Sequence, residues 1–204
     1  MDRRQRKTRK AILNACISLI EEKDFAKITV NDIANRADIN RGTFYLHFLD
    51  KYDMMESFEM EMIEKIEEAI VKNLPEKPSN IDFIETRYDT LVQLLSSFEE
   101  NKDLMRFILK ANYASFLTKW RERLKQIVSQ IILPKIEHLK YDVPFDLFVN
   151  IFTSLAMGLI EYQIQSDEPV NPEESAQLLF QILINGPAKT LGLLPEDIDN
   201  FFKQ

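Results

Sequence analysis

Glycine and cysteine are both scarce in this sequence. Only four Gly and one Cys, Cys16, occur among its 204 residues. A single cysteine excludes a disulfide within the chain and fits a reducing compartment, the cytoplasm. A chain with so little Gly, and with many Leu, Ile, Glu and Lys, favours helices throughout. The sequence therefore predicts an all-α protein.

Long apolar runs and catalytic motifs are missing as well. No run reaches the roughly 18 apolar residues of a membrane-spanning helix, and no apolar signal-peptide core follows the basic first ten residues. The chain has no Gly-rich phosphate loop, no G-x-S-x-G and no H-E-x-x-H, and its two histidines, His47 and His138, are distant in sequence. We therefore expect no membrane segment, no enzymatic activity, no metal and no other cofactor.

Charge is distributed unevenly along the chain. Within the net charge of −7, residues 1–51 hold eleven Lys and Arg against seven Asp and Glu, whereas the remainder holds fifteen against twenty-six. Six of the basic residues lie within positions 3–10 and suggest an electrostatic arm. This division is typical of an anion-binding segment joined to an acidic one. We call residues 1–51 the head, with the basic arm, and residues 52–204 the body, and expect them to be separate domains.

Three short helices are predicted in the head. Apolar residues at helical spacing favour a first helix over residues 8–23, and Thr29 with Asp32 has the form of a capping box that begins a second helix. After the turn DIN, Asn40 can cap a third helix that ends near His47. Two helices joined by a tight turn form a helix-turn-helix unit, whose second helix enters the DNA major groove.

The composition of the third predicted helix fits such a role. Phe44 and Phe48 are four residues apart and can pack inward together, whereas Gly42, without a Cβ, lets the backbone approach a duplex. The polar side chains are then left for DNA, because Arg can bind guanine, Thr either kind of base, and Tyr or Lys a phosphate. These candidates are Arg41, Thr43, Tyr45, His47 and, at the start of the next helix, Lys51.

Residues 8–56 resemble the DNA-binding domain of the TetR family of transcriptional regulators. The family patterns G-F-x-x-T/I-T-V-x-x-I-A and G-T-F/L-Y-x-H/Y-F-x-x-K correspond to DFAKITVNDIA (24–34) and GTFYLHFLDK (42–51). The sequence departs from the family patterns at two positions. Asp24 stands where the family favours Gly. Leu46 stands where a polar residue is common, so we expect base recognition at Leu46 to be weaker or to use a thymine methyl. The resemblance implies that a set of head residues contacts DNA: Thr29, Arg41, Gly42, Thr43, Tyr45, His47 and Lys51.

The body is predicted to be helical too, and the family resemblance implies that it dimerises. Helices are expected from Asp50 to about residue 73 and then over 81–100, 103–110, 113–139, 144–165 and 172–192, with LPEKPSN (74–80) as a linker. The last two are apolar over more than half their girth, as expected for helices covered on several sides. We favour a homodimer interface over a purely intramolecular core, because one helix-turn-helix alone rarely gives specific binding and twofold proteins read palindromes. The interface candidates are Phe148, Phe152, Leu155, Ala156, Leu159, Leu179, Ile182 and Leu183.

Aromatic and Met side chains of the body are candidates for a ligand pocket, although such stripes are more often core. They are Phe98, Met105, Phe107, Tyr113, Phe116, Trp120, Met157 and Tyr162. Few charges accompany them, which favours a hydrophobic small-molecule inducer.

Together these features predict a bacterial, cytoplasmic regulator. We expect a homodimeric repressor that binds double-stranded DNA at a palindromic operator and is released by a small molecule. Two alternatives stay open, namely an activator of the same fold and a ligand sensor or protein partner that does not bind DNA.

Overall fold

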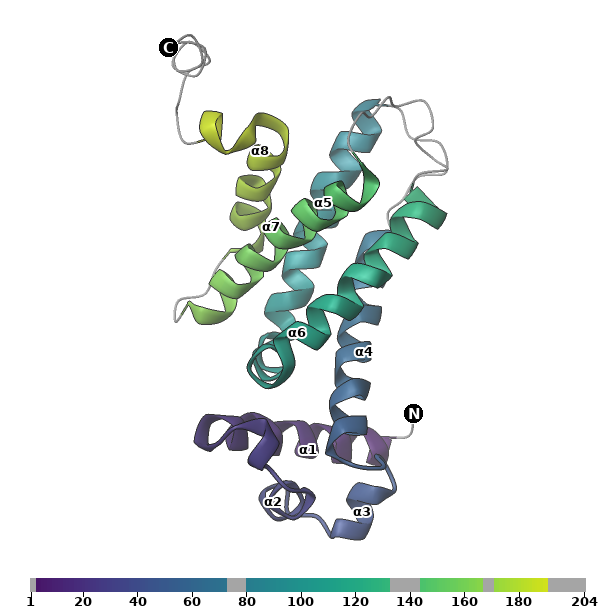
Figure 1. Ribbon diagram of the computed structural model, residues 1–204, viewed down its shortest axis with the longest axis vertical. Coiled ribbons are helices and arrows are strands. Elements are labelled where there is room, and N and C mark those ends of the chain that lie inside the picture. The colour runs from purple at the N-terminus through teal and green to yellow at the C-terminus, as the bar shows by residue number, and fades with distance from the viewer. Residues whose placement is uncertain (1–2, 73–79, 133–143, 167–170, 191–204) are drawn as a thin grey trace. The chain divides into compact units, whose positions relative to one another are not determined.

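The computed structural model describes residues 3–72, 80–132, 144–166 and 171–190, and these ranges contain helices and no strands (Figure 1). The all-α prediction is therefore confirmed. None of the described helices is long and apolar enough to cross a membrane. The predicted linker at 74–80 lies outside the described residues except for its last position. In chain order the elements are α1 (Arg3–Glu22), η1 (Phe25–Lys27), α2 (Val30–Arg36), α3 (Arg41–Tyr45), α4 (Lys51–Val71), α5 (Asn80–Glu100), α6 (Lys102–Ile127), η2 (Val128–Ile132), α7 (Phe145–Gln165) and α8 (Pro172–Thr190).

Packing divides the chain into two compact units. Unit 1 consists of residues 1–67 and 101–126, and unit 2 consists of residues 68–100 and 127–204. Unit 1 contains the whole head together with most of α4 and α6, because the first turns of α4 share the apolar core of the head. The predicted domain boundary at residue 51 stays a prediction.

Helix α1 begins earlier than its apolar pattern indicates. The basic residues predicted to form an arm are instead its first turns, and the Thr8 hydroxyl donates a hydrogen bond to the Arg4 carbonyl at 3.1 Å. Arg, Lys and Gln form helices well, but their polar turns carry no apolar period that a sequence could reveal. The positive charges of the arm are therefore spaced along a helix.

The core of the head is built on Phe44 and Phe48. The Phe44 side chain is completely buried, and the Phe48 ring lies 5.6 Å from it and 5.7 Å from the Phe58 ring of α4. Cys16 of α1 is also buried, with its sulfur 3.6 Å from that of Met54, and burial raises the pKa of its thiol to about 12. The aromatic pair predicted to pack inward is thus confirmed.

Within unit 1, α6 packs on both the head and α4. Its backbone leaves helical geometry at Asn112, which agrees with the break predicted between residues 110 and 113. Before the break, the Phe107 ring lies 6.1 Å from that of Phe25. After it, Lys119 binds the buried carboxylate of Glu59 at 2.7 Å. Apolar and charged contacts therefore join α6 to the rest of the unit.

Unit 2 contains α5, α7 and α8, which contact one another (Figure 1). The Tyr88 ring of α5 lies 5.8 Å from the Phe180 ring of α8. The long helix predicted over residues 172–192 is interrupted at Gly186, where φ is 75° and ψ is 161°. Glycine adopts this positive φ without a steric penalty, and the following Pro187 disfavours helical geometry at the residue before it. The buried side chains of the unit include Leu91, Leu94, Leu95, Phe98, Ala156, Met157, Ile160, Ala176 and Leu179.

Candidate DNA-binding surface

Local hydrogen bonds set the start of α2. The Thr29 hydroxyl accepts from the Asp32 N–H at 3.1 Å, and the Asp32 carboxylate accepts from the Thr29 N–H at 2.8 Å. This reciprocal pair confirms the predicted capping box. The Lys23 ammonium also binds Asp32, at 2.9 Å, and these contacts, that of Lys23 foremost, lower the pKa of the carboxyl to about 2.

Helix α3 begins where the sequence predicts. Asn40 is the N-cap, and its side-chain oxygen accepts from the Gly42 N–H at 2.8 Å. The preceding turn places Asp38 at a φ of 52°, a conformation that Asp tolerates better than most residues. Because Phe44 and Phe48 are fixed in the core, the opposite side of α3 must face outward.

The outward side of α3 contains Arg41, Gly42, Tyr45 and Leu46, all of which are exposed. The Arg41 guanidinium donates to the Tyr45 hydroxyl at 3.0 and 3.3 Å and lies 5.4 Å from the centre of its ring. This contact holds the two side chains together on the surface. A planar donor group and a phenol are thereby presented side by side.

Thr43 and His47 are also predicted to face DNA, but both are half-buried and therefore less exposed than Arg41 and Tyr45. Burial lowers the pKa of His47, and the charge of Arg9 lowers it further. At neutral pH the imidazole is therefore uncharged and offers one donor and one acceptor instead of a positive charge.

Lys51 and Thr29 already have partners within the protein. The Lys51 ammonium donates to the carbonyl oxygens of Phe25, Ala26 and Ile28 at 2.9, 2.7 and 2.8 Å. These three bonds use all three of its N–H donors. The exposed Thr29 hydroxyl donates to the Asp32 carboxylate at 2.8 Å. Both side chains thus shape the segment between α1 and α2.

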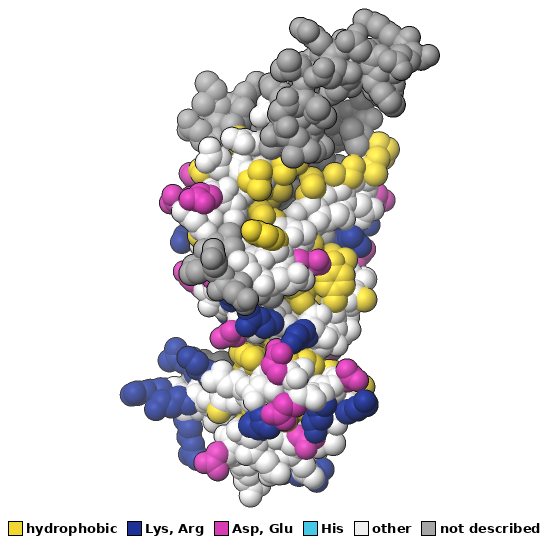
Figure 2. All heavy atoms as spheres, turned by 90° about the vertical axis from the view of Figure 1, so that its left-hand side faces the viewer, with side chains coloured by type: hydrophobic (Ala, Val, Ile, Leu, Met, Phe, Trp, Pro, Cys, Tyr) yellow, Lys and Arg dark blue, Asp and Glu magenta, His cyan; other side chains and the backbone are white. Residues whose placement is uncertain are grey.

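Among the basic residues in the first turns of α1, one packs against other side chains and the others are exposed. The Arg9 guanidinium lies 4.8 Å from the centre of the Phe48 ring and donates to the Ser57 hydroxyl at 3.1 Å. Arg3, Arg4, Arg6, Lys7 and Lys10 are exposed. Figure 2 shows many Lys and Arg side chains, with Asp and Glu side chains among them, on the part of the molecule built from α1, α2 and α3. Sequence alone does not single out Arg9, because its aromatic partners are about forty or more positions away.

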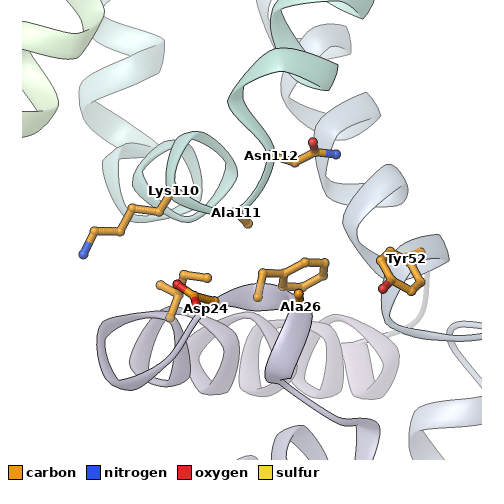
Figure 3. Close-up of a pocket in the computed structure, with 8 residues that line it drawn as sticks. Asp24, Ala26, Tyr52, Lys110, Ala111 and Asn112 are labelled. Carbon is orange, nitrogen blue, oxygen red and sulfur yellow. The ribbon is translucent and has the colours of Figure 1, made fainter.

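Unit 1 also contains an open pocket of about 540 Å³, and Figure 3 shows it between the segment after α1 and the bend of α6. Its lining comprises Ile20, Asp24, Phe25, Ala26, Tyr52, Lys110, Ala111 and Asn112. None of the eight predicted ligand residues is among them. Of those eight, Tyr113 and Tyr162 are exposed by 38% and 64%, and the other six are buried. No group of three or more potential metal ligands occurs among the described residues.

The predicted dimer residues occupy several environments in unit 2. Ala156 and Leu179 are buried within the chain, Leu155, Leu159 and Ile182 are half-buried, and the side chains of Phe148, Phe152 and Leu183 are outside the described part. Other apolar side chains of α7 and α8 are exposed instead, and Figure 2 shows hydrophobic surface on unit 2. They are Leu147, Ile151, Tyr162 and Leu178. The three on α7 recur at helical spacing, a signal that the sequence does contain.

Comparison with known proteins shows which protein family the chain matches. Residues 12–58 match the family model described as bacterial regulatory proteins, tetR family, and residues 85–185 match a transcriptional regulator C-terminal region. The chain belongs to the TetR family. Its members are transcriptional regulators rather than enzymes, and membership implies DNA binding. TetR regulators typically form dimers.

Individual relatives agree with this assignment. The chain is 24% identical over 174 residues to YxbF of Bacillus subtilis (strain 168), an uncharacterized HTH-type transcriptional regulator. The match covers 84% of this chain but 43% of that relative, so the chain spans less than half of its length. A TetR transcriptional regulator from Streptococcus agalactiae 2603V is 25% identical, with a TM-score of 0.56 over 89% of this chain and 96% of that one.

A third relative shares the fold at lower identity. NalD, the secondary repressor of the MexAB-OprM multidrug efflux pump in Pseudomonas aeruginosa, is 20% identical, with a TM-score of 0.60. The match covers 89% of this chain and 97% of NalD. The described helices therefore share the fold of NalD.

Proposed function

We propose that this TetR-family regulator is a homodimeric repressor that binds a palindromic operator on double-stranded DNA in the cytoplasm and is released by a small molecule. The observation that carries the proposal is the outward side of α3, where Arg41 and Tyr45 project from a helix whose other side is fixed by Phe44. A helix held in this way can enter the major groove without losing its packing. The exposed charges of α1 favour approach to the phosphate backbone.

The predicted contacts then divide by role. Arg41 reads a base edge, Tyr45 binds a phosphate, and Gly42 leaves space for the duplex. Thr43 and the uncharged His47 contribute hydrogen bonds from the edge of the helix. Lys51 and Thr29 act by holding the segment between α1 and α2, and any phosphate contact of theirs would compete with the bonds that they make within the protein.

The exposed apolar side chains of α7 and α8 support the proposed dimer. Leu147, Ile151, Tyr162 and Leu178 lie on the last two described helices, where large apolar groups in water are unfavourable. A second copy of the chain would cover the same residues on both protomers. Two α3 helices related by twofold symmetry would then read two half-sites about one DNA turn apart, or a multiple of it.

Repression and release are the finer part of the proposal. NalD is described as a repressor, which supports repression in a protein of the same fold. For a ligand, unit 2 offers the buried side chains of Phe98 and Met157 together with the Gln163 amide, which is buried and has no hydrogen-bond partner among the described residues. A mostly hydrophobic ligand with one donor and one acceptor would satisfy this amide.

The DNA-binding proposal is tested by fluorescence anisotropy with the full chain. A preferred duplex is first selected from random DNA, and binding is then measured at two salt concentrations, with the same duplex carrying one scrambled half-site as the control. We expect tight binding of two protomers per duplex, a steep loss of affinity with salt, and weaker binding to the control. Equal affinity for the selected duplex and for random DNA would contradict the proposal.

The ligand proposal needs a separate test. Hydrophobic compounds are screened by thermal shift, and each one that stabilises the protein is added to the DNA complex in the anisotropy assay. We expect at least one compound to bind and to lower DNA affinity, and we expect Gln163→Leu to weaken its binding more than a matched Gln177→Leu exchange at an exposed position of α8. Stabilising compounds that leave DNA affinity unchanged would contradict release by a ligand.

A further inference from the structure

Two leucines at the end of the recognition helix are almost fully exposed. Leu46, the C-cap of α3, is 84% exposed, and Leu49, in the turn that follows, is 81% exposed. They are the most exposed large apolar side chains among the described residues. Scattered exposed leucines are ordinary, but two within four residues on the outward side of a helix-turn-helix unit require a partner or incur a cost in water.

The backbone that carries these leucines is held firmly. The Leu46 N–H donates to the Gly42 carbonyl at 3.2 Å, so Leu46 still belongs to the helical turn of α3. The Leu49 N–H donates to the Asp53 carboxylate at 2.8 Å, which ties the turn to the first turn of α4. Between them, Phe48 is buried in the core. Both leucines are therefore presented on a fixed surface rather than on a loose loop.

Their surroundings favour DNA over an apolar protein partner. Leu46 directly follows Tyr45, which binds Arg41, and the head carries an excess of positive charge. Two acidic side chains lie nearby, and both are engaged with backbone N–H groups. The Asp50 carboxylate accepts from the N–H groups of Tyr52 and Asp53 at 2.7 and 2.9 Å, and the Asp53 carboxylate accepts from that of Leu49 at 2.8 Å. A duplex offers the complementary charge on its phosphates and, in the major groove, one apolar group, the C5-methyl of thymine.

We propose that Leu46 and Leu49 determine operator specificity by packing against thymine C5-methyl groups in the major groove. This inference rests on the proposed function and adds a reading mode to it. Polar groups of the same helix bind base edges and phosphates, whereas the leucines distinguish thymine from cytosine by its methyl group. Gly42, one helical turn before Leu46, adds no side chain that would hold the two leucines away from the bases.

The test removes single methyl groups from the DNA. Each thymine of the selected duplex is replaced in turn by uracil, which keeps the same base pairing, and affinity is measured for the wild type, Leu46→Ala, Leu49→Ala and Leu46→Met. Met60→Ala, at an exposed apolar position of α4, is the matched control. The loss of one methyl contact is expected to weaken binding about fourfold.

At one thymine, we expect replacement by uracil to weaken binding by the wild type, Leu46→Met and Met60→Ala but to leave binding by Leu46→Ala unchanged. At a second thymine, we expect uracil to weaken binding by the wild type and Met60→Ala but to leave binding by Leu49→Ala unchanged. If uracil had no effect, or the same effect in all variants, the inference would be overturned. The proposed function would still stand as long as the wild type binds the selected duplex specifically. Failure of the selection to enrich any sequence would overturn both.

Discussion

The Lys51 ammonium lies 2.7 Å from the carbonyl oxygen of Ala26. Two further bonds, to the carbonyls of Phe25 and Ile28, complete its hydrogen bonding, and the ammonium also lies 5.1 Å from the centre of the Phe25 ring. A residue at the start of α4 thus closes the segment between α1 and α2. The family motif that ends at this lysine therefore coincides with a structural clamp inside the head.

Replacement of Lys51 should act first on stability. We expect Lys51→Met to lower the free energy of unfolding by roughly 1.5–3 kcal/mol, because charge-assisted hydrogen bonds are lost and three carbonyls lose their partner. Urea unfolding followed by circular dichroism measures the change, with Lys27→Met, at an exposed lysine, as the control. Unchanged stability together with a flatter salt dependence of DNA binding would instead assign the ammonium to a phosphate.

Substitutions at Arg41 and Tyr45 should have different effects on DNA binding, one on sequence preference and the other on affinity for every duplex. We expect Arg41→Ala to weaken binding to the selected duplex by roughly 1–3 kcal/mol and to relax its sequence preference, because a base contact is lost. Tyr45→Phe, which removes only the hydroxyl, should weaken binding to all sequences alike. Tyr52→Phe, at an exposed tyrosine of α4, is the control. If Arg41→Ala weakened all duplexes equally, Arg41 would be a phosphate contact.

Asp32 should make the head sensitive to acid. Its pKa is lowered from 3.8 to about 2, so its contribution to stability is complete above pH 3.8 and is lost as the pH falls toward 2. Asparagine at this position can still accept the Thr29 N–H but cannot form the ion pair with Lys23. We therefore expect Asp32→Asn to unfold more easily than the wild type at about pH 5, with the difference shrinking as the pH approaches 2. A difference independent of pH would mean that the charge is unimportant.

Local features of the head could be predicted from the sequence, because their causes lie within a few residues. The capping box of Thr29 and the cap at Asn40 each depend on side chains two or three positions from the N–H groups that they bind. The buried pair Phe44 and Phe48 follows from helical spacing. Pattern reading succeeds here because cause and effect share one turn of helix.

Features that depend on tertiary packing could not be predicted in this way. The partners of Lys51 lie 23 to 26 positions earlier in the chain, and only the folded head brings them together. The half-burial of Thr43 and His47 likewise depends on neighbouring helices, not on their own helix alone. In α8, the break at Gly186 could have been predicted from the Gly-Pro pair but was hidden by the apolar pattern around it.

Phe44 and Leu46 offer a direct test of which side of α3 is core. We expect Phe44→Ala to lower the free energy of unfolding by roughly 3–5 kcal/mol, because it empties a completely buried site. Leu46→Ala should change it by less than about 0.5 kcal/mol, because the side chain is already in water. Thermal or urea unfolding of the two variants measures both effects. Comparable losses would mean that α3 is rotated from the orientation described.

Ile151 should decide whether α7 contributes to a dimer. The side chain is exposed in the single chain, so Ile151→Asp should leave the fold of the protomer intact. In a dimer with a twofold interface at this position, the exchange would bury one charge from each protomer, and the free-energy cost should dissociate the dimer. Sedimentation should give a mass that falls from twice the 24.0 kDa protomer toward one, and operator affinity should fall toward that for a single half-site. Met60→Asp, which places the same charge at an exposed apolar position of α4, should change neither quantity. A dimer that survives Ile151→Asp would place the interface elsewhere, and the exposed residues of α8, Leu178 first, would be the next to replace.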